Sequence, residues 1–337
     1  MAQARWTTTG ELDLAGYIDK WLGHMRGRVR PGTFGAYECM LRLYAIPVLG
    51  AIPLAELHPL QIQQLYGDLL DSGSHRFGRG LSAGYVLNLH RVLVQSLGAA
   101  FRWGLIPTNP AAAAQPPRPR RPELGQIDPA LANQILEAAR GSRLLELPIA
   151  IALATGMRRG EILGLRWGDL DEDLTVAHVR RSLQSIGGLS FEEPKTPRSR
   201  RAVVLPQFLH PYLVRQREDQ TGRRESFGGA WKATDQVVDR PDGSPVNPAT
   251  FSAEWSKFIR RKGLPRVRFH DLRHAHATLM LLQGVHPKIV SERLGHSNIG
   301  ITLDIYSHVL PTMQSEAAQA FDDLFGTSTE APPQQVS

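Results

Sequence analysis

The chain has 337 residues, with 39 Lys and Arg against 32 Asp and Glu, and its formal net charge of +7 suits a polyanionic partner without requiring one. No stretch approaches the roughly 20 apolar residues of a membrane span, and the N-terminus lacks a signal-peptide core, which predicts a cytoplasmic protein without a membrane partner. The single cysteine, Cys39, excludes an intrachain disulfide, and we expect it to be a small buried hydrophobe.

The first third of the chain predicts a helical domain over residues 11–106, preceded by a short extension at 1–10. Apolar spacing and the Pro and Gly residues between segments place four helices. Ser82 is the expected N-cap of the last of them. The predicted helices are 11–26, 31–46, 59–72 and 82–103.

Residues 107–127 form the predicted linker. Prolines between Pro107 and Pro122 prevent a continuing helix and favour an extended backbone. Arg118, Arg120 and Arg121 add positive charge, so the segment is either a solvated linker or one that contacts phosphates, and both readings stay open.

The remainder predicts a second domain over 128–325 and a disordered polar tail over 326–337. An apolar stripe predicts that the last helix, 312–325, offers Phe321, Leu324 and Phe325 for burial. The fold class is therefore mainly α with a small antiparallel β-sheet. The predicted elements are helices at 128–140, 144–170, 246–262, 271–283, 286–294 and 312–325, and a short sheet from 174–182 with 189–205.

Near the end of this second domain, His270-x-x-Arg273 precedes Leu-Gly-His296 and then Tyr306. A tyrosine with a pKa of about 10 is only about 0.1% ionised at pH 7, so its use as a nucleophile costs roughly 4 kcal/mol without help. His270 and Arg273, three apart at the start of a helix, can face one point and favour an anion. This set of side chains suits the attack of a protein nucleophile on a phosphate.

Upstream segments supply further cations. In Thr155-Gly-Met-Arg158-Arg-Gly-Glu161, two glycines flank an arginine at a turn entering an apolar helix. Lys195 follows on a loop or hairpin between extended segments. Arginine, lysine, histidine, arginine, histidine and tyrosine thus occur in order along the chain.

From about residue 11 to residue 325, this ordered set resembles the tyrosine recombinases, the phage-integrase family. The resemblance implies a two-domain architecture, with a helical SAM-like core-binding domain and a mixed α/β catalytic domain. It also implies that Glu161 supports the first arginine. The active-site residues that it implies are Arg158, Lys195, His270, Arg273, His296 and Tyr306.

By this resemblance the protein is a site-specific DNA recombinase that works through a 3′-phosphotyrosyl intermediate, without metal or cofactor. Integration and excision of a phage or mobile element is the first expectation, and chromosome-dimer resolution is the alternative. The implied partners are double-stranded recombination sites, three further protomers in a tetramer, and accessory or directionality proteins, all at the nucleoid. Because the core-binding pattern starts near Glu11, we expect no additional N-terminal arm-binding domain.

The resemblance also implies roles. Arg158 and Arg273 would hold the non-bridging phosphate oxygens, because planar guanidinium groups fit them best. Lys195 would protonate the leaving 5′-oxygen, His270 would act in proton transfer at the nucleophile, and His296 would hydrogen-bond the phosphate.

Two rival functions remain. The first is a zinc hydrolase, because His270 and His274 are four residues apart, although the Glu of a His-Glu-x-x-His pair is missing. The second is a DNA-binding relative that does not cut. For His274 and His276 we expect structural roles.

Overall fold

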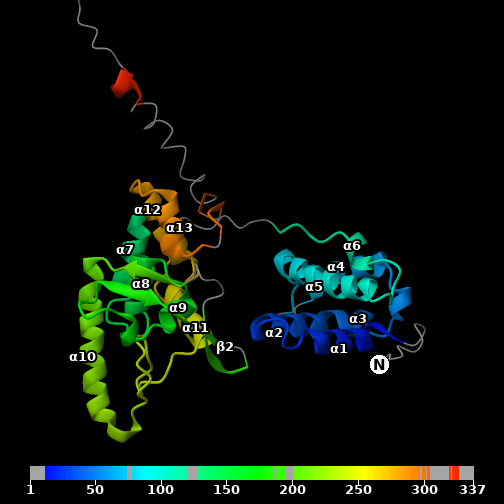
Figure 1. Cartoon of the computed structure of the whole chain (residues 1–337), viewed down its shortest axis with the longest axis horizontal. Helices are drawn as coiled ribbons and strands as arrows, with labels where there is room; N and C mark the ends of the chain where they lie inside the picture. The colour runs from blue at the N-terminus through cyan, green and yellow to red at the C-terminus, as the bar shows by residue number, and fades with distance from the viewer. Residues whose placement is uncertain are drawn as a thin grey trace, which may run out of the picture. The chain divides into compact units, whose positions relative to one another are not determined.

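The structure, a computed structural model, divides into two compact units, Met1–Glu123 and Leu124–Ser337 (Figure 1). Its helices and small antiparallel sheets confirm the predicted fold class. The predicted domain limits stay a prediction. The described residues are 12–73, 78–119, 127–185, 187–193, 200–296, 298–300, 302–303, 319 and 321–325.

The N-terminal unit contains helices throughout its described part, and all four predicted helices are present. Its elements are α1 (Leu14–Met25), α2 (Pro31–Met40), a π-helical turn (Leu41–Ala45), α3 (Ile46–Leu49), a 3-10 turn (Leu54–Glu56), α4 (Pro59–Ser72), α5 (Ala83–Arg102) and α6 (Pro110–Ala113).

Local capping explains where these helices begin. The Asp13 carboxylate accepts a hydrogen bond from the Gly16 amide at 2.8 Å at the start of α1. The predicted cap on α5 is confirmed, since the Ser82 hydroxyl accepts from the Tyr85 amide at 3.3 Å. α4 begins with Pro59, whose missing amide hydrogen costs nothing in the first turn of a helix.

The expected end of the second helix before Pro47 was wrong. The helical path continues through the π-helical turn into α3 and ends at Leu49. A proline inside a helix lacks a donor and presses on the carbonyl four residues back. The wider π turn, in which the Ile46 amide bonds to the Leu41 carbonyl, brings the helical path to that proline without a break.

The core of the N-terminal unit forms where α1, α4 and α5 meet, around the fully buried Trp21, Tyr17 and Tyr66. α2 buries none of its residues completely. Cys39 belongs to this helix and is exposed, so the expectation that it is buried was wrong.

The C-terminal unit combines helices with short strands. Its elements are α7 (Pro129–Ala138), α8 (Glu146–Thr155), α9 (Arg159–Leu163), a 3-10 turn (Trp167–Asp169), β1 (Val176–Val179), β2 (Ser182–Ser185), β3 (Leu189–Glu192), β4 (Arg201–Val204), a 3-10 turn (Gln207–Leu209), α10 (His210–Phe227), a 3-10 turn (Gly228–Ala230), α11 (Pro248–Arg261), α12 (Asp271–Leu282) and α13 (Pro287–Leu294).

The strands form two antiparallel pairs in place of the one predicted sheet. β1 pairs with β4, and β2 pairs with β3, with Val176 opposite Val204 and Ser182 opposite Glu192. β2 and β3 thus form a hairpin that continues outward from the inner β1–β4 pair.

The single helix predicted over 144–170 is divided. Its first part, α8, is almost entirely buried. It stops at Gly156, which has a φ of 64° and takes the left-handed conformation that suits glycine at a helix end. α9 then begins after a short turn, as the two glycines around Arg158 had indicated.

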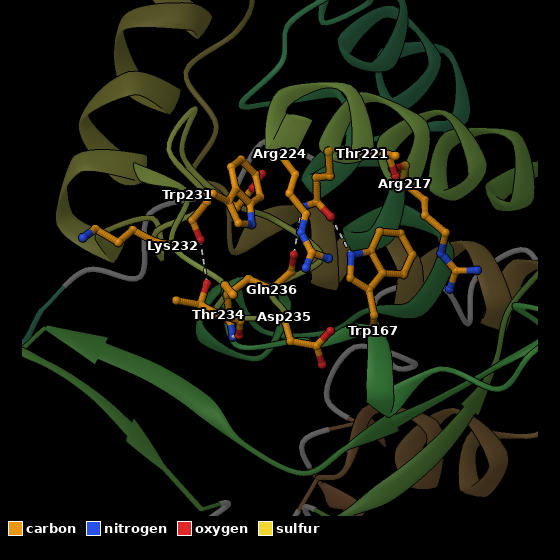
Figure 2. A pocket seen from close by; sticks show the side chains of 13 residues that line it. Trp167, Arg217, Thr221, Arg224, Trp231, Lys232, Thr234, Asp235 and Gln236 are labelled. Carbon is orange, nitrogen blue, oxygen red and sulfur yellow. Dashed lines mark hydrogen bonds between the residues drawn. The ribbon is translucent and has the colours of Figure 1, made fainter. Parts of the chain in front are cut away.

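The long helix α10 was not predicted. The sequence of α10 shows little apolar periodicity, and Leu213 is the one residue of this helix that is completely buried. Side-chain amides attach it instead: Gln220 accepts from the Trp167 indole at 2.6 Å and donates to the Gln236 carbonyl at 2.9 Å. Trp167 and Gln236 line a pocket of about 260 Å³ that contains none of the described site residues predicted above (Figure 2).

Most of the predicted helix 312–325 lies outside the described residues. Residues 321–325 are helical, and Phe321, Leu324 and Phe325 are 64%, 74% and 71% exposed in the single chain, so they remain available for burial, as predicted. Within the described part of the chain, every helix is too short or too polar to span a membrane.

Candidate active site

Arg273 lies in the first turn of α12 and is 3% exposed. Its Nη1 donates to the Gly156 carbonyl at 2.6 Å, and its Nη2 donates to the Leu294 carbonyl at 2.7 Å. Burial, then the charge of Arg158, lowers the pKa of this guanidinium to about 9, which still leaves it charged at pH 7. Arg273 therefore joins the end of α8 to the end of α13 and places a positive charge between them.

Arg158 precedes α9, at the turn opened by Gly156. Its Nη1 donates to Glu161 Oε1 at 2.8 Å, and its backbone amide donates to Glu161 Oε2 at 2.9 Å. The Arg158 side chain stays 39% exposed, whereas that of Glu161 is 4% exposed. The predicted supporting carboxylate is thus in contact with the predicted arginine, although its role in catalysis stays a prediction.

The two arginines meet at the end of α13. Arg273 donates to the Leu294 carbonyl, and Arg158 Nη2 donates to the next carbonyl, that of Gly295, at 3.4 Å. His296 follows directly in the chain. The segment around Arg158 lies more than a hundred residues before the other two, and the contacts among the three bring two guanidinium groups and an imidazole together.

His270 and His296 are both neutral at pH 7. Burial, followed by the charges of His274 and Arg273, lowers the pKa of His270 to about 4, although its ring keeps contact with solvent. Burial and the charges of Arg273 and Arg158 lower the pKa of His296 to about 4 as well. His296 Nδ1 lies 2.8 Å from Thr302 Oγ1, and if that hydroxyl donates, Nε2 carries the hydrogen and is a donor.

Two further arginines support the site, and the sequence did not single them out. Arg201 on β4 donates to both oxygens of Glu161, at 2.9 and 3.3 Å. Arg293 on α13 donates to the carbonyls of Ala154 and Val204, each at 2.9 Å. Arg201 stands in a segment already rich in arginine, and Arg293 is the single arginine of α13 and belongs to no motif, so only their distant partners distinguish them.

His276 has the expected structural role in its contacts. Its Nδ1 lies 2.8 Å from the Leu153 carbonyl, and Arg293 Nε donates to its Nε2 at 3.3 Å. Burial lowers its pKa to about 4. It therefore helps to hold α12 against α8 and α13.

The alternative of a zinc hydrolase would require further metal ligands beside His270 and His274. The rings of His270 and His274 are 5.1 Å apart and perpendicular. Asp271, the carboxylate between them, accepts hydrogen bonds from the amide and guanidinium of Arg268. Among the described residues, no group of three or more His, Cys, Asp and Glu side chains could hold a metal ion.

A cleft of about 1050 Å³ opens beside Arg158 and His270, between β2, α11 and the start of α12. No acidic side chain is found among the described residues that line it. Gly160 forms part of its wall, where a Cβ atom would come 2.4 Å from Ser182 Oγ. The basic lining residues are Arg158, Arg159, Arg260, Arg266, Arg268 and His270.

Lys195 and Tyr306 lie outside the described residues. Of the predicted set, the structure therefore brings together Arg158, His270, Arg273 and His296, with Glu161 beside Arg158. Such an arrangement, with two guanidinium groups next to a basic cleft, can bind the oxygens of a phosphodiester.

Comparisons with known proteins agree with this fold. The phage integrase family model matches residues 126–313, more than half of the chain, and the model of the phage integrase N-terminal SAM-like domain matches residues 14–70. The chain belongs to the phage integrase family of tyrosine recombinases. The activity of its class is site-specific DNA recombination by a tyrosine nucleophile.

Individual relatives extend the similarity over most of the chain. A protein named tyrosine recombinase XerC-like from Caldanaerobacter subterraneus subsp. tengcongensis is 29% identical, over 94% of this chain and 84% of its own length. The fold is similar to that of the Tn1549 transposon integrase in complex with a circular intermediate DNA, with a TM-score of 0.76, 20% identity, and coverage of 92% of this chain and 100% of that one. It is also similar to a lambda integrase tetramer bound to a Holliday junction, with a TM-score of 0.64, 18% identity, and coverage of 88% and 78%.

Proposed function

We propose that this recombinase integrates and excises a phage or other mobile element, with Tyr306 as the nucleophile and Arg158, Lys195, His270, Arg273 and His296 as the other catalytic residues. The observation that carries the residue assignment is the meeting of Arg158 and Arg273 on consecutive carbonyls at the end of α13. The likeness to a transposon integrase supports the mobile-element role.

In the proposed reaction, the Tyr306 hydroxyl attacks a DNA phosphorus and loses its proton. The bond from phosphorus to the 5′-oxygen breaks, and Lys195 donates a proton to that leaving oxygen. The products are a 3′-phosphotyrosyl link and a free 5′-hydroxyl. A 5′-hydroxyl of the partner strand then attacks this link, releases Tyr306 and restores a phosphodiester, so no ATP is consumed.

The described residues would lower the barrier through fixed positive charge. The transition state places extra negative charge on the non-bridging oxygens, and preorganised guanidinium groups stabilise that charge without moving. Arg273 keeps unused N–H groups after its two carbonyl bonds, because each Nη carries two hydrogens. His270, neutral before DNA binds, can accept the tyrosine proton, and His296 can donate to a phosphate oxygen.

Assembly and location belong to the same proposal. A lambda integrase tetramer binds a Holliday junction, and we propose that this chain likewise forms a tetramer on two double-stranded sites. Residues 11–106 would bind the core site as one domain and residues 128–325 as the other, joined by the linker 107–127. Accessory or directionality proteins would act with it at the bacterial nucleoid.

The direct test is a denaturing gel of wild-type protein and Tyr306→Phe. Both are incubated in EDTA with nicked DNA fragments tiled across the regions that flank the gene. We expect a covalent protein–DNA band that requires Tyr306. A band that forms only with fragments from a distant chromosomal site, incubated in parallel, would favour the alternative of chromosome-dimer resolution. Specific binding without a band from any fragment would favour a relative that does not cut.

A further inference from the structure

Arg201 lies on the inner strand β4, and its side chain is 6% exposed. Its Nε donates to the Arg293 carbonyl at 2.6 Å, and its two Nη atoms donate to the two oxygens of Glu161. These partners lie in α13 and α9. The residue is thus largely enclosed by protein, and these hydrogen bonds direct its guanidinium towards Glu161 and the end of α13.

Glu161 forms ion pairs with two arginines, of which Arg158 has a partly exposed side chain and Arg201 a buried one. Arg158 stays 39% exposed, whereas Arg201 and Glu161 are sealed from solvent. Burial alone would raise the pKa of Glu161, but the charges of Arg201 and Arg158 hold it below its usual value. The carboxylate is therefore an anion directly behind the exposed guanidinium.

The charge balance of this cluster decides how Arg158 interacts with an incoming phosphate. With Arg201 present, the two guanidinium groups and one carboxylate carry a net charge of +1. Without Arg201, the carboxylate would pair with Arg158 alone, and the net charge would be zero. Because charges that are partly buried in protein interact more strongly than charges in bulk water, that change would weaken the stabilisation of a developing phosphorane.

We propose that Arg201 is a positioning residue of the recombination reaction: it neutralises and orients Glu161, so that Arg158 keeps its positive charge for the scissile phosphate. This inference rests on the proposed function. Arg201 does not touch the substrate, and it also fixes the end of α13 through the Arg293 carbonyl, where Arg273 and Arg158 are held. Arg201 thus affects both the charge balance around Arg158 and the position of the α13 carbonyls that Arg158 and Arg273 contact.

The test measures single-turnover cleavage of a nicked duplex carrying the recombination site, at saturating DNA. The full-length variants are Arg201→Met, Glu161→Gln/Arg201→Met and Arg201→Lys. We expect Arg201→Met to cleave roughly a hundredfold more slowly than wild type, the size of effect seen when one transition-state donor is lost. Its Kd for DNA should stay within about threefold of wild type, because phosphate contacts across the whole site dominate affinity.

Removing the carboxylate as well restores the net charge of +1, so Glu161→Gln/Arg201→Met should cleave about tenfold faster than Arg201→Met. A merely structural role for Arg201 would make the double variant no faster, and that result would overturn the proposal, as would wild-type cleavage by Arg201→Met. Arg200→Met is the matched control, since Arg200 is exposed and pairs with Glu193. It should cleave at the wild-type rate.

Arg201→Lys covers the case in which Arg201→Met does not fold. It keeps the charge and loses the paired hydrogen bonds, so we expect it to retain at least about a tenth of wild-type cleavage. Cleavage by folded Arg201→Lys more than about a thousandfold below wild type would contradict the charge-balance role. If wild-type protein itself forms no Tyr306-dependent covalent band, the proposed function fails on that result alone, whatever the Arg201 variants do.

Discussion

The partners of His276 determine its protonation state. The Leu153 carbonyl can only accept a hydrogen bond, and the Arg293 guanidinium can only donate one. The imidazole must therefore carry its hydrogen on Nδ1 and keep Nε2 as an acceptor, which is a neutral tautomer. A second proton would place an N–H against a guanidinium group.

This arrangement predicts a pH-dependent stability. The folded-state pKa of His276, about 4, lies below the value of about 6.5 expected in the unfolded chain. The unfolded chain then binds more protons between these values, so the free energy of unfolding is highest above about pH 6.5 and falls as the pH drops towards 4. The contribution of this residue is at most about 3 kcal/mol.

The free energy of unfolding should fall as the pH drops from 7 to 4.5. We expect this fall to be about 2 kcal/mol smaller in His276→Gln than in the wild type. Urea unfolding curves across this range measure the difference. His210→Gln, at the exposed start of α10, is the control and should follow the wild-type curve. Identical pH profiles for His276→Gln and wild type would contradict the neutral-tautomer interpretation.

At this scale the sequence predicted residues that carry recognisable chemistry in a motif. Arg158, Glu161, His270, Arg273 and His296 do lie together. Arg201 was missed because it is one arginine among several in its segment, and Arg293 because it belongs to no motif; the partners of both are distant in sequence. Residues that support an active site from the protein interior can be identified only from their tertiary contacts.

At the scale of elements, Gly156 is the point where α8 stops and the site begins. Its φ of 64° strains any residue with a Cβ, and a Cβ there would lie 2.4 Å from Leu294 Cδ2 and 2.7 Å from His276 Cδ2. The carbonyl of Gly156 also accepts from Arg273. A change here therefore acts on packing and on the arginine together.

We expect Gly156→Ala to lower the free energy of unfolding by about 3 kcal/mol, roughly 1 from the backbone and the rest from overpacking. It should also slow cleavage by at least about tenfold, because the acceptor of Arg273 moves. Gly284→Ala is a matched control: Gly284 has a φ of 74° but open space around its Cβ position, so it should cost only the backbone share. Equal losses in the two variants, measured by denaturant unfolding, would argue against the close packing.

Elements with local signals were predicted well and elements without them were not. α4 and α5 agree with their predicted ranges to within a residue, because Pro59 and Ser82 mark their starts. α10 was missed because amide contacts, rather than an apolar stripe, hold it to the unit. The glycines around Arg158 indicated the break in 144–170, but the good helix formers on both sides of Gly156 favoured one continuous range.

At the scale of the whole molecule, each unit has its own hydrophobic core. The cluster around Trp21 draws only on the N-terminal unit, and the cluster around Phe251 and Trp255 draws only on the C-terminal one. Units of this size with separate cores are expected to fold without each other. The sequence indicated this division through its proline-rich segment.

Separate expression of residues 1–123 and 124–337 tests the division. We expect each fragment to unfold cooperatively in denaturant, and the first to show a predominantly helical circular dichroism spectrum. The whole chain should then show two transitions near those of the fragments. A fragment 1–123 that shows no cooperative transition would mean that its core depends on the other unit.

The two hydrogen bonds from Arg273 to backbone carbonyls have a consequence for related proteins that lose their cleavage activity. Because this guanidinium joins the ends of α8 and α13, losing it would loosen the unit whether or not DNA is ever cut. A lineage that abandoned strand cleavage and kept only DNA binding would still be under pressure to retain the arginine. The presence of this arginine in a relative would therefore not by itself indicate that the relative still cuts DNA.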